Sequence, residues 1–138
     1  YKQFMDVIIL RLFFVYGKIQ KSNMLMPRLV ASVKNGSHVK LQGNNGILLN
    51  PIHVSDAVSS ILKAIELKGS FKINVAGPEV LSIKEICTLI GKKIGVKPVF
   101  ENEMLSLPGH LVADITNMKH LLVDPRRFLI DGLDEMIY

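Results

Sequence analysis

The sequence predicts a mixed α/β fold that forms the second half of a larger α/β protein. Strand-like and helix-like segments alternate along the 138 residues in the order β-α-β-β-α-β-α-β-α, which is typical of layered α/β proteins. The apolar segment at 7–12, VIILRL, has the composition of a strand that is buried on both faces and needs neighbours on both sides. We therefore expect residues 1–138 to be a single partial domain, with another domain missing before it.

The elements after this first strand follow from local composition. A Tyr-Gly break and a polar loop precede a predicted helix at 24–34, where Pro27 is tolerated because it lies in the first turn. Gly36 is a suitable residue to end that helix. The segment at 38–43, HVKLQG, alternates weakly and predicts a short strand, and NNG at 44–46 predicts a turn.

The middle of the chain is predicted to be an extended segment followed by an amphipathic helix. Residues 47–54 are extended, and Pro51 restricts them to a sheet edge or a bend. Ser55 is the expected N-cap of a helix at 56–68, and Asp56 suits the positive first turn of that helix better than it suits acid catalysis. Apolar residues at spacings of three and four form one face of this helix: Val58, Ile61, Leu62 and Ile65.

The second half continues the alternation. The segment at 71–77, FKINVAG, predicts a second buried strand, and the helix at 82–95 opens with Ser82 and Glu85 at the spacing of a capping box. The apolar face of that helix contains Ile83, Ile86, Leu89, Ile90 and Ile94. The remaining predicted elements are a strand at 98–102 and helices at about 117–122 and 126–136.

Composition excludes several classes of protein. Hydrophobic residues make up 49% and charged residues 21%, which is unlike a disordered chain. The net charge is +5, but the basic residues are scattered without aromatic interleaving, so we expect no nucleic-acid partner. The apolar run at 7–16 is too short to span a membrane. We expect a cytoplasmic protein that acts on a small-molecule substrate and self-associates through exposed apolar surface around this run.

The reactive residues give no sign of a metal or thiol site. The four histidines have no metal-ligand spacing with cysteine or carboxylates, so we expect no metal. Cys87, the only cysteine, cannot form an internal disulfide, which fits a reducing compartment. It lies on an amphipathic helix, where a small packed residue is expected rather than a nucleophile.

Four segments in order carry a resemblance to a known family: ILRLFFVYG, NPIHVSDAVSSILKAI, KINVAGPEVLSIKEICTLIGKKIG and ADITNMKHLLVDPRRFLIDGL. Together they resemble the C-terminal, substrate-binding part of an extended short-chain dehydrogenase/reductase of the NAD-dependent epimerase/dehydratase family. The resemblance implies a Rossmann-type α/β fold. It also implies NAD or NADP, bound mainly by an N-terminal dinucleotide-binding domain that is absent from this chain.

The family's catalytic residues are not in this sequence. The resemblance implies a Gly-rich cofactor turn and a Tyr-x-x-x-Lys pair, in which a nearby cation helps a phenol of pKa near 10 to ionise. The patch GNNG at 43–46 follows a predicted strand but opens no helix, and no tyrosine is followed four residues later by lysine. We therefore expect this chain to hold no catalytic residue and not to be catalytic alone.

The resemblance also implies ligand contacts. The backbone of Leu12 and Phe13 would pass near the nicotinamide, and Phe14 stands where the family often has a substrate-binding Asn. The expected pocket is lined by Phe14, Met24, Leu25, Arg28, Leu48 and Asn50. His53 is either a polar pocket contact or a structural link from strand to helix. Arg11 is either an anion contact or an internal clamp, and Asn50 either binds ligand or forms an Asx turn.

Nucleotide-sugar members of the family place an Arg in two stretches that have none here, GILLNP at 46–51 and EMLSLPGHL at 103–111. Lys18, Lys21 or Arg28 could replace them as charges. The leading hypothesis is the substrate-binding part of an enzyme that acts on a sugar or nucleotide sugar by transient hydride transfer. The alternatives are a non-catalytic ligand-binding or interaction module that retains the fold, and a truncation with no function of its own. A homo-oligomer remains open.

Overall fold

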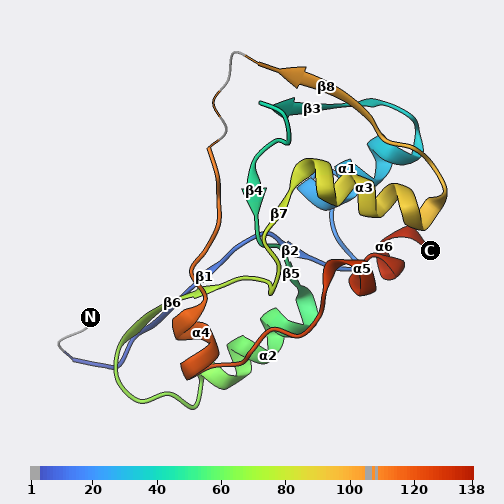
Figure 1. Cartoon of the computed structure of the whole chain (residues 1–138). Helices are drawn as coiled ribbons and strands as arrows, with labels where there is room; N and C mark the ends of the chain where they lie inside the picture. The colour runs from blue at the N-terminus through green and yellow to red at the C-terminus, as the bar shows by residue number, and fades with distance from the viewer. Residues whose placement is uncertain (1–3, 105–106, 108) are drawn as a thin grey trace.

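The computed structural model describes residues 4–104, 107 and 109–138 (Figure 1). Within these ranges the strands form four two-stranded sheets, three of them parallel and one antiparallel, with helices packed around them. This arrangement confirms the predicted mixed α/β fold. Each predicted strand and helix has a counterpart, although several begin or end at different residues and the helix predicted at 126–136 is divided in two.

The strands are β1 (Ile8–Leu12), β2 (Val15–Tyr16), β3 (His38–Gln42), β4 (Leu48–Leu49), β5 (Ile52–His53), β6 (Phe71–Val75), β7 (Leu81–Ser82) and β8 (Val99–Glu103). The helices are α1 (Leu25–Lys34), α2 (Val54–Ala64), α3 (Ile83–Ile94), α4 (Thr116–Leu121), α5 (Leu129–Gly132) and α6 (Asp134–Ile137). The pairs are β1 with β6, β2 with β5, β3 with β8 and β4 with β7.

One part of the core lies between the β1–β6 pair and the helices α2 and α4. β1 and β6 are parallel, with Ile8 opposite Phe71 and Leu12 opposite Val75. The buried residues of this cluster come from β5, α2, β6 and the segment around α4: Ile52, Ala57, Ala64, Ile73, Val75, Met118 and Leu122. A pair of parallel strands is thus covered on one face by two helices.

The larger part of the core lies among α1, α3, α5 and β3. In β3, Val39 and Leu41 are buried while the alternate residues are exposed, as expected for a strand with one face on the core. The α3 helix has the predicted capping box: Glu85 N donates to Ser82 Oγ at 3.1 Å, and Ser82 N donates to Glu85 Oε2 at 2.7 Å. This core supports the cavity described below.

The apolar face predicted for α2 does not face the core. Val58, Ile61, Leu62 and Ile65 share one side of the helix, but they are 47%, 40%, 61% and 77% exposed. The buried positions of α2 are instead the small residues Ala57, Ser60 and Ala64. Small side chains let the helix lie close to the strands, so the large apolar residues remain on its flank.

The N-cap of α2 also differs from the prediction. Ser55 was the expected cap, but His53 occupies the cap position, with φ −66° and ψ 142°, and its side chain accepts a hydrogen bond from Ser55 N. A histidine nitrogen thus satisfies one of the amide groups that have no partner inside the helix. The sequence rules favoured Ser because it is a far commoner cap than His.

The first strand is less buried than its composition predicts. In β1, Ile9 is 38% and Leu12 is 47% exposed, and Arg11 is exposed as well. Within the described residues β1 pairs only with β6, so its other edge is open. The apolar surface expected around residues 7–16 is therefore present.

The segment after α4 is held to the rest of the protein by carboxylates. Asp56 Oδ2 accepts hydrogen bonds from Arg126 N at 3.1 Å and Arg127 N at 2.9 Å. Glu79 Oε2 accepts one from Leu129 N at 2.7 Å, at the start of α5. The helix predicted at 126–136 is accordingly two short helices, α5 and α6. Asp56, expected at a helix start, also binds this segment.

Candidate functional site

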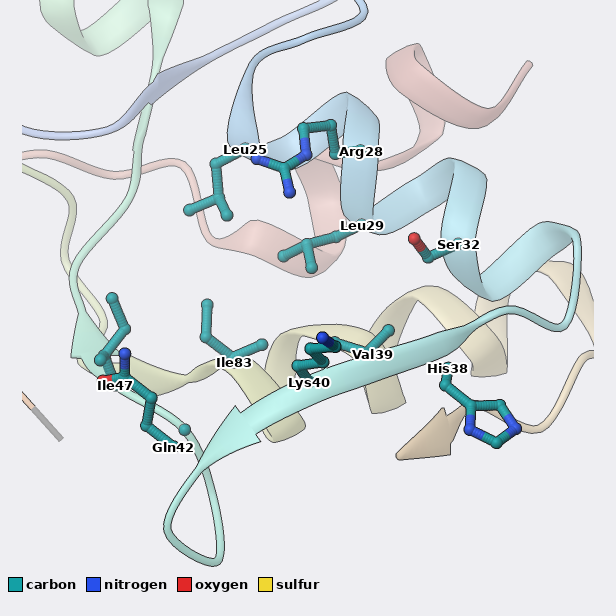
Figure 2. Close-up of a pocket in the computed structure, with 11 residues that line it drawn as sticks. Leu25, Arg28, Leu29, Ser32, His38, Val39, Lys40, Gln42, Ile47 and Ile83 are labelled. Atoms are coloured by element: carbon teal, nitrogen blue, oxygen red, sulfur yellow. The ribbon is translucent and has the colours of Figure 1, made fainter. Parts of the chain in front are cut away.

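The candidate site is a cavity of about 400 Å³ between α1 and β3. One end is closed by the turn before β4 and by the first residue of α3 (Figure 2). Its lining residues are Leu25, Arg28, Leu29, Ser32, His38, Val39, Lys40, Gln42, Gly46, Ile47 and Ile83. A cavity of this volume is in the range of small-molecule sites.

The α1 wall of the cavity combines apolar and cationic groups. Leu29 is buried and packs on the core, while Arg28 is exposed beside it. Arg28 and Ser32 are four residues apart and therefore lie on the same side of the helix. In Figure 2 the side chains of Leu25, Arg28 and Leu29 extend from α1 toward the side formed by β3 and β4. This wall offers one planar cation above an apolar surface.

The β3 wall adds further basic groups. His38, Lys40 and Gln42 line the cavity, and Lys40 Nζ lies 3.9 Å from Glu103 Oε1 on the neighbouring strand. Arg28 has no ion-pair partner within 4.0 Å among the residues that the structure describes. The described cations of the cavity are therefore incompletely neutralised.

Gly46 shapes the closed end of the cavity. Its φ is +78°, a conformation that favours glycine, and an added Cβ would lie 2.9 Å from Ile83 Cβ and 3.2 Å from Leu41 Cδ2. The turn predicted at 44–46 therefore needs glycine at its last position both for its backbone and for the space beside α3.

The predicted pocket residues divide among several places. Leu25 and Arg28 both line the cavity, and that they bind a ligand stays a prediction. Met24 lines a second hollow, of about 490 Å³, near the start of α2. The other residues of this hollow are Val15, Tyr16, Gly17, Lys18, Ile19, Gln20, Val54 and Glu135. Phe14 and Leu48 line neither space, so the structure does not bring the whole predicted set together.

Asn50 is buried and bound to the backbone of a distant segment. Its Nδ2 donates to Ala113 O at 2.9 Å, and its Oδ1 accepts from Ala113 N at 3.0 Å. Only 2% of the residue is exposed. This clamp is neither a local Asx turn nor an open ligand contact, and it fixes residues 109–114 beside β4.

His53 joins the start of α2 to α6. Its Nδ1 accepts from Ser55 N at 3.1 Å, and its Nε2 lies 3.0 Å from Glu135 Oε2. Glu135 Oε1 lies 2.7 Å from an Arg127 guanidinium nitrogen. The hydrogen bond from His53 holds the pKa of Glu135 below its usual value, and Arg127 adds to this effect. The arrangement matches the structural alternative for His53, while its ligand contact stays a prediction.

Tyr16 packs beside this group. Its ring meets the His53 ring edge-on, with 5.3 Å between centroids. Tyr16 is 1% exposed, and its hydroxyl has no hydrogen-bond partner among the described residues. Burial raises the pKa of Tyr16, and the nearby Glu79 raises it further. Tyr16 is therefore neutral near neutral pH.

Phe14 has an uncommon backbone conformation. Its φ is +47°, the only positive value for a residue other than glycine in the described part of the chain. Its carbonyl accepts a hydrogen bond from Ile52 N at 3.2 Å, which connects the end of β1 to β5. A bulky residue in this conformation costs energy, and such strain is often found near functional sites.

The dinucleotide contacts predicted at the end of β1 cannot be complete within this chain. Phe13 N donates to Val75 O at 2.9 Å, so this amide is already used by the sheet. The turn at 43–46 links two strands, and Asn45 O there accepts a hydrogen bond from Lys84 N. The turn at 43–46 therefore does not lead from a strand into a helix, the arrangement that cradles a dinucleotide.

Sequence reasoning missed the β3 wall. The alternation in HVKLQ places His38, Lys40 and Gln42 on the opposite face from Val39 and Leu41. That pattern was visible, but the cavity also requires α1, whose packing against β3 cannot be predicted from the alternation alone. The stretches 46–51 and 103–111, which lack the family's Arg, contribute no cation to the cavity among the described residues. Residues 105–106 and 108 lie outside the described ranges.

Other chemistry finds no support in the described ranges. No group of three or more His, Cys, Asp or Glu side chains there is arranged to hold a metal ion. Cys87 is fully buried, and burial raises the pKa of its thiol to about 12, so it is a packed residue as predicted. No helix of 18 or more described residues is apolar enough to cross a bilayer.

Comparisons with known proteins agree with this architecture. The sequence model of the NAD dependent epimerase/dehydratase family matches residues 1–76. The uncharacterized UDP-glucose epimerase YtcB of Bacillus subtilis (strain 168) is 30% identical over 137 residues, which cover 95% of this chain and 43% of that protein.

Two solved structures are similar over nearly the whole chain. MoeE5 in complex with UDP-glucuronic acid and NAD has 26% identity and a TM-score of 0.79, over 96% of this chain and 46% of that one. The UDP-glucuronic acid 4-epimerase of Bacillus cereus, in complex with UDP-glucuronic acid and NAD, has 28% identity and a TM-score of 0.79, over 94% and 43%. The chain thus spans less than half the length of these relatives. It belongs to the NAD dependent epimerase/dehydratase family.

Proposed function

We propose that this chain is the substrate-binding part of an NAD(P)-dependent epimerase or dehydratase that acts on a nucleotide sugar. The cavity between α1 and β3 would hold the nucleotide diphosphate end of that substrate. The observation that carries this proposal is Arg28, a cation without an ion-pair partner among the described residues, at the wall of an apolar cavity.

The cavity suits both parts of such a ligand. Leu29, Val39 and Ile83 supply apolar surface for a base or ribose, and the planar guanidinium of Arg28 can bind two phosphate oxygens at once. Lys40 adds positive charge on the opposite wall. Arg28 thus takes the place of the cations that the family keeps in the stretches 46–51 and 103–111.

The redox step would belong to a different part of the protein. The similar structures hold NAD together with a UDP-sugar, and this chain matches less than half of each. A nicotinamide cofactor would supply the hydride chemistry, while this chain would position the sugar. In that arrangement the end of β1, at Leu12 and Phe13, lies nearest the cofactor, and the dinucleotide-binding domain comes from outside residues 1–138.

A second candidate function is a ligand-binding module without catalysis. It is favoured by Phe14, which cannot donate the hydrogen bond that Asn supplies to substrate in the family. Both candidates use the same cavity, so binding alone does not separate them. Turnover of a UDP-sugar with NAD by the full-length gene product would support the enzyme, and tight binding without turnover would support the module.

The cavity can be tested by isothermal titration of the 138-residue chain with UDP-glucuronic acid, UDP-glucose and UDP. We expect all three to bind, because the diphosphate is common to them. Arg28→Ala should weaken binding roughly 10- to 100-fold, the effect of losing a charge-assisted hydrogen bond. Lys34→Ala is the matched control, since Lys34 is an exposed cation of the same helix outside the cavity.

Two outcomes would contradict the proposal. If UDP does not bind, or if Arg28→Ala and Lys34→Ala bind it equally well, the cavity is not the nucleotide site. A loss of binding in both variants would point to a general effect of positive charge rather than to the cavity. Circular dichroism of each variant would confirm that the fold is intact.

A further inference from the structure

We propose that the cavity between α1 and β3 selects thymidine diphosphate, a 2′-deoxyribonucleotide with a 5-methylated pyrimidine base. This inference rests on the proposed function, because it assumes that the cavity holds a nucleoside diphosphate. It departs from the similar structures, which hold UDP-sugars. Three features of the cavity carry it: the open edge of β3, the acid-free lining and the apolar residues in the middle.

The open edge of β3 presents backbone groups to the cavity. Gly43 N donates to Glu103 O on β8 at 3.3 Å, so the odd-numbered residues of this segment bind β8. In a parallel pair the N–H and C=O groups of the even-numbered residues then point to the other side. The even-numbered residues His38, Lys40 and Gln42 all line the cavity, and among the described residues no strand pairs with β3 there. The β3 wall therefore offers backbone donors and acceptors in alternation.

This order of groups suits the imide side of uracil or thymine. Along the open edge the N–H of Lys40, the C=O of Lys40 and the N–H of Gln42 read donor, acceptor, donor. The imide of uracil and thymine reads acceptor, donor, acceptor, because an N–H lies between two C=O groups. Cytosine, adenine and guanine have amino groups on this side of the base and do not give that order. The β3 edge therefore favours a uracil-type base.

No carboxylate lines the cavity in the described part of the chain. The residues outside the described ranges, 1–3, 105–106 and 108, contain no Asp or Glu. Glu103 lies 3.9 Å from Lys40 Nζ but is not a lining residue. An acidic side chain is the usual hydrogen-bond acceptor for a ribose hydroxyl in nucleotide sites. The cavity therefore lacks the acidic group that favours ribose over 2′-deoxyribose.

The middle of the cavity is apolar. Leu29, Val39 and Ile83 line it and are 7%, 6% and 8% exposed. In Figure 2 they lie between the polar side chains of Ser32 and Gln42. A nucleotide that loses its 2′-hydroxyl group or gains a methyl group is more apolar, and burial of apolar surface is favourable. Both differences between UDP and thymidine diphosphate therefore suit this part of the cavity.

The two walls also determine where the methyl group lies. When the imide side of the base meets β3, C5 and C6 of the ring are on the opposite side and point toward α1. Leu29 is the α1 residue that is both buried and part of the lining. The C5-methyl group of the bound base therefore contacts Leu29.

The test is isothermal titration of the 138-residue chain with UDP, 2′-deoxy-UDP, 5-methyl-UDP and thymidine diphosphate. This set separates the effect of the methyl group from that of the hydroxyl group. We expect the methyl group to strengthen binding about 4-fold on either sugar, the effect of burying one such group. Removal of the 2′-hydroxyl group should change the affinity by less than about 2-fold, because a hydroxyl group that is recognised contributes about 2- to 10-fold.

Variants locate each contribution. Arg28→Ala should weaken binding of all four nucleotides by the same factor, because the diphosphate is common to them, and so leave their ratios unchanged. Leu29→Ala should reduce the gain from the methyl group, whereas Leu62→Ala, at an exposed leucine of α2 outside the cavity, should not. Leu29 belongs to the core, so circular dichroism must show that its variant is folded. The comparison of the four nucleotides in the unaltered chain needs no variant.

Three results would overturn the inference. The first is tighter binding of UDP than of thymidine diphosphate. The second is equal binding of the methylated and unmethylated nucleotides, and the third is a loss of affinity when the 2′-hydroxyl group is removed. In each case binding of UDP would leave the proposed function intact. If none of the four nucleotides binds, the proposed function fails and this inference fails with it.

Discussion

His53 Nε2 lies 3.0 Å from Glu135 Oε2, although 82 residues separate the two in the chain. The same carboxylate binds Arg127, and the other nitrogen of His53 caps α2. One histidine thus connects the start of a central helix to the C-terminal segment. The consequences of this contact can be measured without knowing the ligand.

Stability should depend on pH through Glu135. Its pKa is lowered in the folded protein, first by the hydrogen bond from His53, so the unfolded chain binds the proton more readily. The contribution of this group is present above the ordinary value of 4.5 and is lost as the pH falls from there through the lowered pKa. We expect Glu135→Gln to reduce this acid loss, measured as the free energy of unfolding in urea from neutral pH down to well below the ordinary value of 4.5.

Asp114 must be controlled for in that experiment. Hydrogen bonds from Thr116 also lower its pKa, so it adds to the loss of stability at acid pH. The double variant Glu135→Gln and Asp114→Asn should therefore be less sensitive to acid than either single variant. An unchanged pH profile in Glu135→Gln would show that the contact with His53 does not form in solution.

Gly132→Ala should destabilise the protein. An added Cβ would lie 2.5 Å from the Tyr16 hydroxyl and 2.7 Å from its ring, and Tyr16 is 1% exposed and cannot move aside. Overpacking of this kind costs about 1–3 kcal/mol. Gly109→Ala is the control, because a Cβ there meets nothing within 4 Å. Equal urea midpoints for both variants would show that α5 does not pack on Tyr16.

Asn50→Ala should destabilise the protein by more than the small change in side-chain size suggests. The substitution removes two hydrogen bonds and leaves both backbone groups of Ala113 without their partner, at about 1–3 kcal/mol for each buried group. Asn117→Ala, at an exposed position of α4, should be near neutral. Hydrogen exchange of Ala113 N should also accelerate in Asn50→Ala. An unaltered exchange rate would contradict the clamp.

The positive φ of Phe14 predicts that the usual order of stability of glycine and alanine variants is reversed at this position. At ordinary dihedral angles a glycine is less stable than an alanine, but at φ +47° alanine keeps the left-handed strain and glycine does not. Phe14→Gly should therefore be more stable than Phe14→Ala, by about 1 kcal/mol. Thermal unfolding of the two variants measures the difference, and the opposite order would place Phe14 at negative φ.

The architecture could be predicted because local patterns and tertiary structure agree over most of the chain. The capping box at Ser82 and Glu85 fixed the start of α3, and the alternation around Val39 and Leu41 fixed the inner face of β3. These features depend on neighbours within a few residues. They are present in the sequence before any contact between distant segments forms.

Predictions failed where distant residues decide the outcome. Composition predicts that Val58 and Leu62 face the core, but the strands accept only the small Ala57 and Ala64 at close range. Similarly, the cap of α2 is His53 because Glu135, far along the chain, orients its ring. On the α1 side of the cavity, sequence reasoning named Leu25 and Arg28, while the β3 side depends on how the helix lies over the strand.

The carboxylates of Asp56 and Glu79 have a consequence for the order of folding. They bind backbone amides of Arg126, Arg127 and Leu129, so contacts of high sequence separation complete the core. Such contacts form late in folding, because closing the long loop costs conformational entropy before the contacts can contribute stability. During synthesis the strands near the start of the chain therefore lack these contacts until residues 126–129 have been made. Until then the Tyr16 side of the core is accessible to chaperones and proteases.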